Sequence, residues 1–194
     1  MTFLKSILLG TGFALVTGAS ANAAPVTYEI DPSHTYPSFE ADHMGGLSTW
    51  RGKFNRTNGT IVLDREAKAG TIDVTVQIDS VDFVHDEMNA HAVAPDIFNA
   101  AKYPTATFKG TFTEFDGKRP TAAEGDLTLR GVTRVIKLDI EKFKCIDHPM
   151  EKREACGADV SASFKRSDFG LDFALDKGFK PEVELKIQVE ALRK

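Results

Sequence analysis

The chain has 194 residues and a formal net charge of −4 at pH 7, with hydrophobic residues making up 42% and charged residues 27%. Charges of both signs are interspersed, so the long basic runs with which proteins bind nucleic acid or anionic lipid are missing from the sequence. This length and composition suit one domain with a sizeable core, and we expect no nucleic-acid partner.

The N-terminal residues 1–23 have the three-part layout of a secretory signal peptide. Lys5 supplies the positive start, residues 6–16 are mostly apolar, and Ala21-Asn22-Ala23 is typical of a cleavage site. The apolar run is too short to be a permanent membrane span. We therefore expect cleavage after Ala23, export without a transmembrane segment, and one mature domain over residues 24–194.

After residue 24 the dominant period in the sequence is two, which is typical of β-strands with one buried face. The alternating segments cover residues 71–79, 107–112, 136–141, 158–164 and 183–190. Burial of one face favours antiparallel sheet over the doubly buried strands of parallel sheets. Counting such segments gives roughly eight to ten strands, which predicts an all-β barrel or sandwich.

Turn-forming residues separate these segments. Asn58-Gly59 lies between two apolar runs and predicts a tight hairpin turn. Asp116-Gly117 and Arg130-Gly131 predict two further turns between neighbouring strands.

The strand pattern is interrupted between Phe83 and Tyr103. Residues 87–94 favour helix by propensity, and Pro95 suits the first position of a second short helix over residues 96–101. We expect a short helical insertion near residues 86–101 that lies across an open end of the barrel as a lid.

Cys145 and Cys156 are the two cysteines of the chain. In an exported protein such a pair predicts a disulfide, here across a polar, proline-containing loop between strand-like segments. The bond would stabilise the fold by about 3 kcal/mol in the chain-entropy model. Because the spacing is not Cys-x-x-Cys, we favour a structural staple over a redox-active pair.

The five histidines do not follow a metal-binding or catalytic pattern. His85 and His91 are six residues apart and do not share a helix face, and strict alternation puts His34 and His43 on opposite faces of a strand. No nucleophile elbow or glycine-rich phosphate loop accompanies them. We therefore expect no catalytic residue and no metal site.

Fourteen phenylalanines are many for this length, and several fall on the apolar faces of the predicted strands, together with Trp50. In a sandwich they would form an ordinary core. In a closed barrel of about eight strands they can instead line a cavity for one small apolar ligand. The residues alone leave a filled core and a binding cavity equally open.

Several motifs resemble those of the YceI family, in the same order along nearly the whole mature chain. They are Asp31-Pro32-Ser33-His34-Thr35 with Phe39, His43-Met44-Gly45 and Gly52-Lys53-Phe54, then Pro95-Asp96-Ile97-Phe98 with Lys102-Tyr103-Pro104-Thr105-Ala106-Thr107-Phe108, then Gly125-Asp126-Leu127-Thr128-Leu129-Arg130-Gly131-Val132-Thr133, and Lys165-Arg166-Ser167-Asp168-Phe169-Gly170-Leu171. Thr35 stands where many members carry serine, and Val135 where many carry proline. The first change keeps a hydroxyl, and the second should loosen one turn without reaching the pocket.

The resemblance implies a lipocalin-like antiparallel barrel in the periplasm. Such a barrel holds a polyisoprenoid or similar long-chain apolar ligand, a quinone or its precursor, and acts as carrier or buffer without a catalytic centre or any other cofactor. The expected lining residues are Phe39, Trp50, Phe54, Ile72, Val74, Val76, Phe98, Phe108, Phe112 and Phe169. The expected headgroup contacts at the mouth are Asp31, His34, His43 and Arg166.

Two other interpretations stay open. One is a structural or stress-related barrel whose core is simply filled, acting as a monomer or a homodimer. The other is a lipid-modifying enzyme that uses His34 or His43 as a base.

Overall fold

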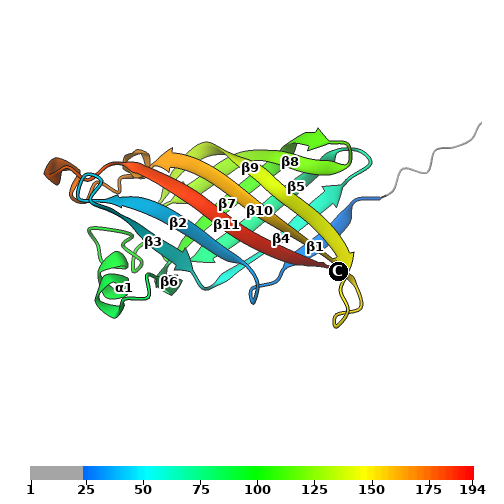
Figure 1. Cartoon of the computed structure of the whole chain (residues 1–194), viewed down its shortest axis with the longest axis horizontal. Helices are drawn as coiled ribbons and strands as arrows, with labels where there is room; N and C mark the ends of the chain where they lie inside the picture. The colour runs from blue at the N-terminus through cyan, green and yellow to red at the C-terminus, as the bar shows by residue number, and fades with distance from the viewer. Residues whose placement is uncertain (1–23) are drawn as a thin grey trace, which may run out of the picture.

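The computed structural model describes residues 24–194, so the expected signal peptide lies outside the described residues. Eight strands close an antiparallel barrel in the order β1-β4-β5-β7-β8-β9-β10-β11, and β11 pairs back with β1 (Figure 1). Their bounds are β1 (Val26–Ile30), β4 (Thr57–Asp64), β5 (Ala69–Gln77), β7 (Thr105–Asp116), β8 (Arg119–Leu129), β9 (Val132–Asp147), β10 (Glu154–Lys165) and β11 (Glu182–Arg193). The prediction of an antiparallel barrel of about eight strands is confirmed.

Strand β11 changes partner along its length. Its last residues pair with β1, whereas residues 183–188 pair with β2 (Tyr36–His43). Strand β2 then pairs with β3 (Ser48–Phe54), which pairs with the short β6 (Val81–Asp82). These three strands extend the barrel wall at one end.

The chain bends sharply between β1 and β2, and Thr35 fixes this bend. Thr35 is 2% exposed. Its hydroxyl donates to the backbone oxygen of Glu190 and accepts from the backbone N–H of the same residue, both at 3.1 Å. The backbone N–H of Asp31 donates to the same oxygen at 2.9 Å. The hydroxyl at position 35 therefore has a structural role.

The hairpin turn predicted at Asn58-Gly59 is wrong. Both residues lie inside β4, and the chain turns earlier, at Asn55 and Arg56. The backbone N–H of Arg56 donates to the Ser80 hydroxyl at 3.0 Å and holds this turn. Gly59 is required for another reason, since a Cβ atom there would lie 2.3 Å from the backbone oxygen of Asp73 on β5.

The turn predicted at Arg130-Gly131 connects β8 and β9, with left-handed φ values of 53° and 76°. Both residues therefore have the backbone conformation of a two-residue hairpin turn that follows the twist of the strands. Val135 lies beyond this turn with 63% of its surface exposed, away from the barrel interior.

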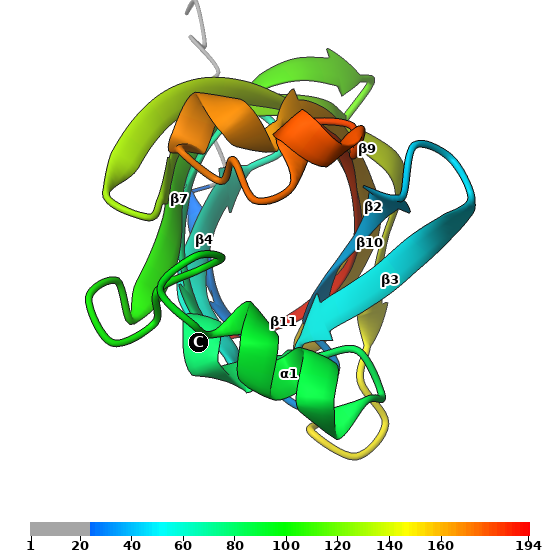
Figure 2. The same cartoon turned by 90° about the vertical axis from the view of Figure 1, so that its left-hand side faces the viewer.

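The predicted helical insertion is shorter than expected. Helix α1 (Asp86–Ala92) forms, and the His85 side chain caps it by accepting a hydrogen bond from the Met88 backbone N–H at 3.2 Å. The second helix predicted over residues 96–101 is wrong. Those residues form turns, because Asn99 adopts a left-handed φ of 52° and interrupts any helical repeat. Helix α1 lies at the rim of one barrel opening (Figure 2).

The opposite end of the barrel carries the disulfide. Cys145 on β9 and Cys156 on β10 are directly paired across the two strands, with their Cα atoms 4.0 Å apart. The predicted bond between them is confirmed. It closes the hairpin whose loop is seen at the end away from α1 (Figure 1).

A buried polar group lies beside this disulfide. Tyr28 on β1 is 2% exposed, and its hydroxyl donates to the carboxylate of Glu154. The same carboxylate forms an ion pair with Arg65 at 3.0 Å. Burial, and then the hydrogen bond and negative charge of Glu154, raise the pKa of Tyr28 to about 12. This network fastens β1 to β10 across the barrel end.

Removing the disulfide should destabilise the barrel without unravelling its topology. A Cys145→Ala, Cys156→Ala variant is expected to lose about 3 kcal/mol of unfolding free energy, because the hairpin loop is no longer constrained in the unfolded chain. Denaturant unfolding measures this loss. Reducing agent should lower the stability of the parent protein to that of the variant and leave the variant unchanged, and equal stability in both oxidised proteins would contradict the prediction.

The Tyr28 phenol should ionise late in an alkaline titration. Since its pKa in the folded protein lies above the usual 10.0, the fold favours the neutral phenol, and the stabilisation is lost as pH rises from 10 to about 12. Tyrosinate absorbance should show one of the three tyrosines ionising near 12, and Tyr28→Phe should remove that step. Tyr28→Phe should also cost about 2 kcal/mol of stability at neutral pH, as a hydrogen bond to a charged group is lost.

Candidate functional site

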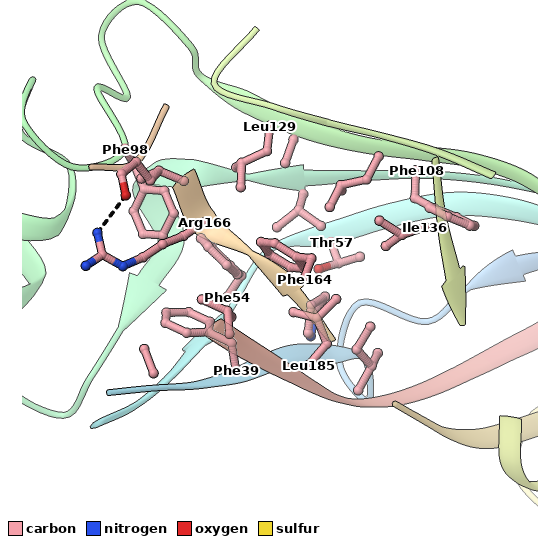
Figure 3. A pocket seen from close by; sticks show the side chains of 18 of the residues that line it. Phe39, Phe54, Thr57, Phe98, Phe108, Leu129, Ile136, Phe164, Arg166 and Leu185 are labelled. Carbon is pink, nitrogen blue, oxygen red and sulfur yellow. Dashed lines mark hydrogen bonds between the residues drawn. The ribbon is translucent and has the colours of Figure 1, made fainter. Parts of the chain in front are cut away.

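The barrel encloses a cavity of about 520 Å³ that reaches the α1 end, where Met88 and His91 line its mouth. This volume lies in the range of about 300–1,000 Å³ typical of sites for small organic ligands. Its wall consists mostly of phenylalanine, leucine, isoleucine and valine side chains that point inward from the strands (Figure 3). The interior is therefore not the filled core of the structural interpretation.

Most of the predicted lining residues face this cavity. Those on its wall are Phe39, Trp50, Phe54, Ile72, Val74, Val76, Phe98 and Phe108. The alternation of β5 shows why the pattern predicted their orientation. Ile72 and Val74 point inward, whereas Asp73 between them points outward and pairs with Lys109 at 2.9 Å. That these side chains contact a ligand stays a prediction.

The structure places the other two predicted lining residues elsewhere. Phe112 lines a second, smaller cavity of about 70 Å³ at the disulfide end. Phe169 does not line either cavity: it is 1% exposed and packs against Phe164 with ring centroids 5.1 Å apart. It follows β10 in a 3-10 turn (Arg166–Phe169), so the two-residue alternation of the strand no longer determines its direction.

Three aromatic rings meet between the opening and the deeper cavity. Phe39 and Phe98 both lie against Phe54, with ring centroids 5.7 Å apart in each pair. Gly52 on β3 makes room for them, because a Cβ atom there would lie 2.6 Å from the Phe39 ring. These rings give the outer part of the cavity an aromatic wall, with residues from β2, β3 and the segment after α1.

Arg166 is the cationic side chain on the cavity wall. Its guanidinium donates from Nη1 to the backbone oxygen of Leu171 at 2.6 Å and from Nε to that of Lys180 at 3.3 Å. Partial burial lowers the pKa of Arg166, while the carboxylates of Asp172 and Asp42 oppose that shift. Arg166 is thus held at the mouth with its charge turned toward the loops that form the rim.

Asp42 and His43 also lie at the mouth. Backbone N–H groups of Lys180 and Gly45 donate to the Asp42 carboxylate at 3.0 and 2.9 Å and lower its pKa. The His43 ring packs against Trp50 and Phe179, with centroids 5.2 and 5.4 Å apart. The mouth therefore combines a carboxylate, an imidazole and a guanidinium with an aromatic surface.

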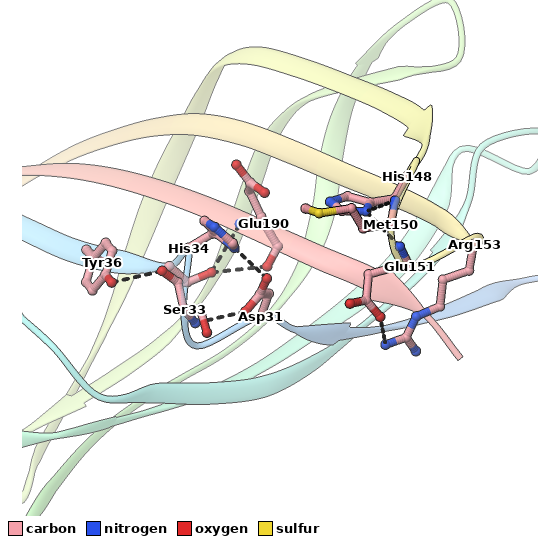
Figure 4. A network of polar contacts seen from close by, with 10 residues as sticks. Asp31, Ser33, His34, Tyr36, His148, Met150, Glu151, Arg153 and Glu190 are labelled. Atoms are coloured by element: carbon pink, nitrogen blue, oxygen red, sulfur yellow. Dashed lines mark hydrogen bonds and ion pairs between the residues drawn. The ribbon is translucent and has the colours of Figure 1, made fainter.

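The structure places the other two predicted headgroup residues away from the cavity wall. Asp31 and His34 pair with each other at 2.7 Å in the bend between β1 and β2, on the outside of the barrel (Figure 4). Burial opposes the shift, but hydrogen bonds from His34 and Ser33 lower the pKa of Asp31, and the same pair raises the pKa of His34. Both residues come just before β2 in the sequence, but the sequence does not show in which direction β2 runs. In the structure β2 starts at this bend and runs toward the mouth, so residues before it lie away from the mouth.

The sequence analysis missed the half of the wall that lacks aromatic residues. Ile136 and Leu138 on β9, and Leu185, Ile187 and Val189 on β11, line the cavity. The alternation over residues 136–141 and 183–190 contained this signal. Met88 and His91, which line the mouth from α1, had no comparable signal because a helix of seven residues is too short for its period to be detected.

Comparisons with known proteins agree with this architecture. The profile of the YceI-like domain matches residues 28–191. The chain is 33% identical over 193 residues to Protein YceI of Escherichia coli O6:H1, which covers 98% of this chain and 99% of the relative. It is also 33% identical over 186 residues to a UPF0312 protein of Pseudomonas aeruginosa, which covers 95% of each.

Solved structures share the fold. The YceI protein of Campylobacter jejuni superposes with a TM-score of 0.62 at 26% identity, over 76% of this chain and 87% of that one. A polyisoprenoid binding domain from Saccharophagus degradans superposes with the same TM-score at 14% identity, over 87% of this chain and 99% of that one. Within residues 24–194, no helix is long and apolar enough to span a membrane. By its sequence and the fold it encodes, the chain belongs to the YceI family.

Proposed function

We propose that the protein binds a polyisoprenoid or similar long-chain lipid, such as a quinone or its precursor, inside the barrel and serves as its carrier or buffer in the periplasm. The observation that carries this proposal is the apolar cavity of about 520 Å³ inside the barrel. An elongated, almost wholly apolar cavity offers little to a polar metabolite, since each polar group would lose its hydrogen bonds to water on entry.

The affinity would come from moving apolar chain out of water. Each buried methylene contributes about 0.8 kcal/mol, so a ten-carbon stretch contributes about 8 kcal/mol before the costs of association and ordering are subtracted. The aromatic rings at the outer end of the cavity add contact area with little loss of side-chain freedom. The wall alone is therefore sufficient for useful binding without any covalent or metal bond.

The ligand would enter with its apolar end first and leave its polar end at the mouth. Arg166, His43 and Asp42 supply the charged and hydrogen-bonding groups there, whereas the deeper wall is apolar. A quinone ring or a phosphorylated end suits such a mouth, because both offer oxygen atoms that accept hydrogen bonds. The related domain from Saccharophagus degradans is described as polyisoprenoid binding, which supports the same ligand class.

We propose binding without catalysis. His34 lies outside the cavity in the Asp31 pair, and the His43 ring packs between two aromatic side chains. The two histidines suggested as a base thus belong to different places in the fold. His34→Ala should leave the cellular function intact, since His34 lies outside the cavity, and loss of function in this variant would favour the enzyme.

Native mass spectrometry of the protein from its own periplasm tests the proposal. We expect a stoichiometric bound mass that organic extraction releases and whose fragments differ by isoprene units. A protein without bound mass, unchanged after incubation with quinones and prenyl alcohols, would contradict lipid binding. A bound polar metabolite would contradict the assigned ligand class.

Val76→Asp should abolish lipid binding while the barrel still folds. Val76 faces the cavity, so an aspartate there puts a charge beside the ligand chain, and we expect affinity to fall by at least about tenfold. Thr75→Asp is the matched control, since position 75 precedes it on the outer face of β5. Lipid titration followed by Trp50 fluorescence measures both variants, and full affinity in Val76→Asp would show that the cavity is not the binding site.

A further inference from the structure

The barrel contains two cavities that meet at a ring of side chains. The larger cavity of about 520 Å³ opens at the mouth, and the smaller one of about 70 Å³ lies toward the disulfide. Five residues line both and are called the constriction here: Ile61, Ile72, Leu138, Val160 and Val189. They come from five strands, β4, β5, β9, β10 and β11, so the ring reaches around most of the barrel.

The strand register explains how the ring closes. Ile61 and Ile72 are cross-strand partners, and Ile72 is paired on its other side with Gly110 of β7. Gly110 in turn pairs with Gly125 of β8, so two neighbouring strands bring no side chain to this level. The Phe108 ring covers this gap, because a Cβ atom at Gly110 would lie 2.8 Å from it. Side chains from five strands, and the Phe108 ring beside Gly110, thus lie where the two cavities meet.

The smaller cavity beyond the constriction is almost wholly apolar and lies against the buried residues of the disulfide end. Tyr28 and Cys156 lie on its wall, Tyr28 tied by its hydroxyl to Glu154 and Cys156 by its disulfide to Cys145. A chain that passed the constriction would therefore have room for only a few carbon atoms before it met the end of the barrel.

We propose that the constriction sets the length of apolar chain that the protein binds, by stopping the chain end at the level of Leu138 and Val160. This inference rests on the proposed lipid-binding function. Affinity should then rise with chain length only until the chain reaches the constriction. Any further isoprene unit stays at the mouth in water and adds nothing.

The test is a series of prenyl alcohols that differ by one isoprene unit. Trp50 is the single tryptophan and lies on the cavity wall, so its fluorescence reports binding of each alcohol. For the unmodified protein we expect the dissociation constant to fall about fourfold per buried methylene and then to level off at a defined length.

Leu138→Ala should join the two cavities and move this limit to a longer chain. The longest alcohol that still gains affinity should increase by about one isoprene unit, with a gain of at least tenfold for that alcohol. Val160→Ala is a second widening variant should Leu138→Ala fold poorly. Adding Ala158→Leu fills the smaller cavity, which Ala158 lines, and should return the limit to its original length.

Leu127→Ala is the matched control, because Leu127 lines only the larger cavity and the same atoms are removed away from the constriction. It should weaken binding of all alcohols without moving the limit. An unchanged limit in both folded widening variants would overturn the proposal, as would the same shift in Leu127→Ala. Failure of every alcohol to bind the unmodified protein would instead contradict the proposed function.

Discussion

Closure of the sheet through β11 is the constraint on which the rest of the structure depends. One strand pairs with β10 along one edge and with both β1 and β2 along the other, so the barrel has two different ends. At the β1 end the wall closes tightly around Tyr28 and the disulfide. At the β2 end, β2, β3 and β6 form the wall, and an opening remains beside α1 (Figure 2).

Because side chains alternate between the two faces of each strand, closing the sheet gives the barrel an interior lined by every second residue. Once an antiparallel sheet of eight strands is closed, every second residue must face a common interior. The interior here has packed side chains toward both ends, and the large cavity lies between them and extends to the mouth. Tyr28, Leu63, Cys156 and Ala191 pack at one end, and clusters around Phe39 and Phe169 pack at the other. At the mouth the same side chains, such as Phe39 and Phe54, both pack in the core and line the cavity, whereas the cluster around Tyr28 lies outside the large cavity.

The sequence predicted those features that are determined by residues close together in the chain, and it failed for features that depend on residues far apart. The inward direction of Ile72 and Val76 followed from two-residue alternation, which is local, and the disulfide followed from the presence of two cysteines in a chain expected to be exported. Asn58-Gly59 misled because a glycine can serve close strand approach as well as a turn. The sequence did not reveal where Asp31 and His34 lie, because the position of their bend depends on the hydrogen bond between Thr35 and Glu190, which are 155 residues apart in the chain. No local pattern contains that information.

The charged residues and the apolar cavity lie at different places along the barrel, and this difference favours one orientation of a bound ligand. Arg166, His43 and Asp42 gather at the mouth of the large cavity, while the Glu154 carboxylate at the other end of the barrel is occupied by Tyr28 and Arg65. A ligand with one polar and one apolar end thus meets a polar partner at the mouth and an apolar, closed wall inside. The reverse orientation would bury the polar end without hydrogen bonds, which costs several kcal/mol. This free-energy difference between the two orientations is enough to orient the ligand. The barrel therefore needs no specific contact with the apolar part of the ligand to set its orientation.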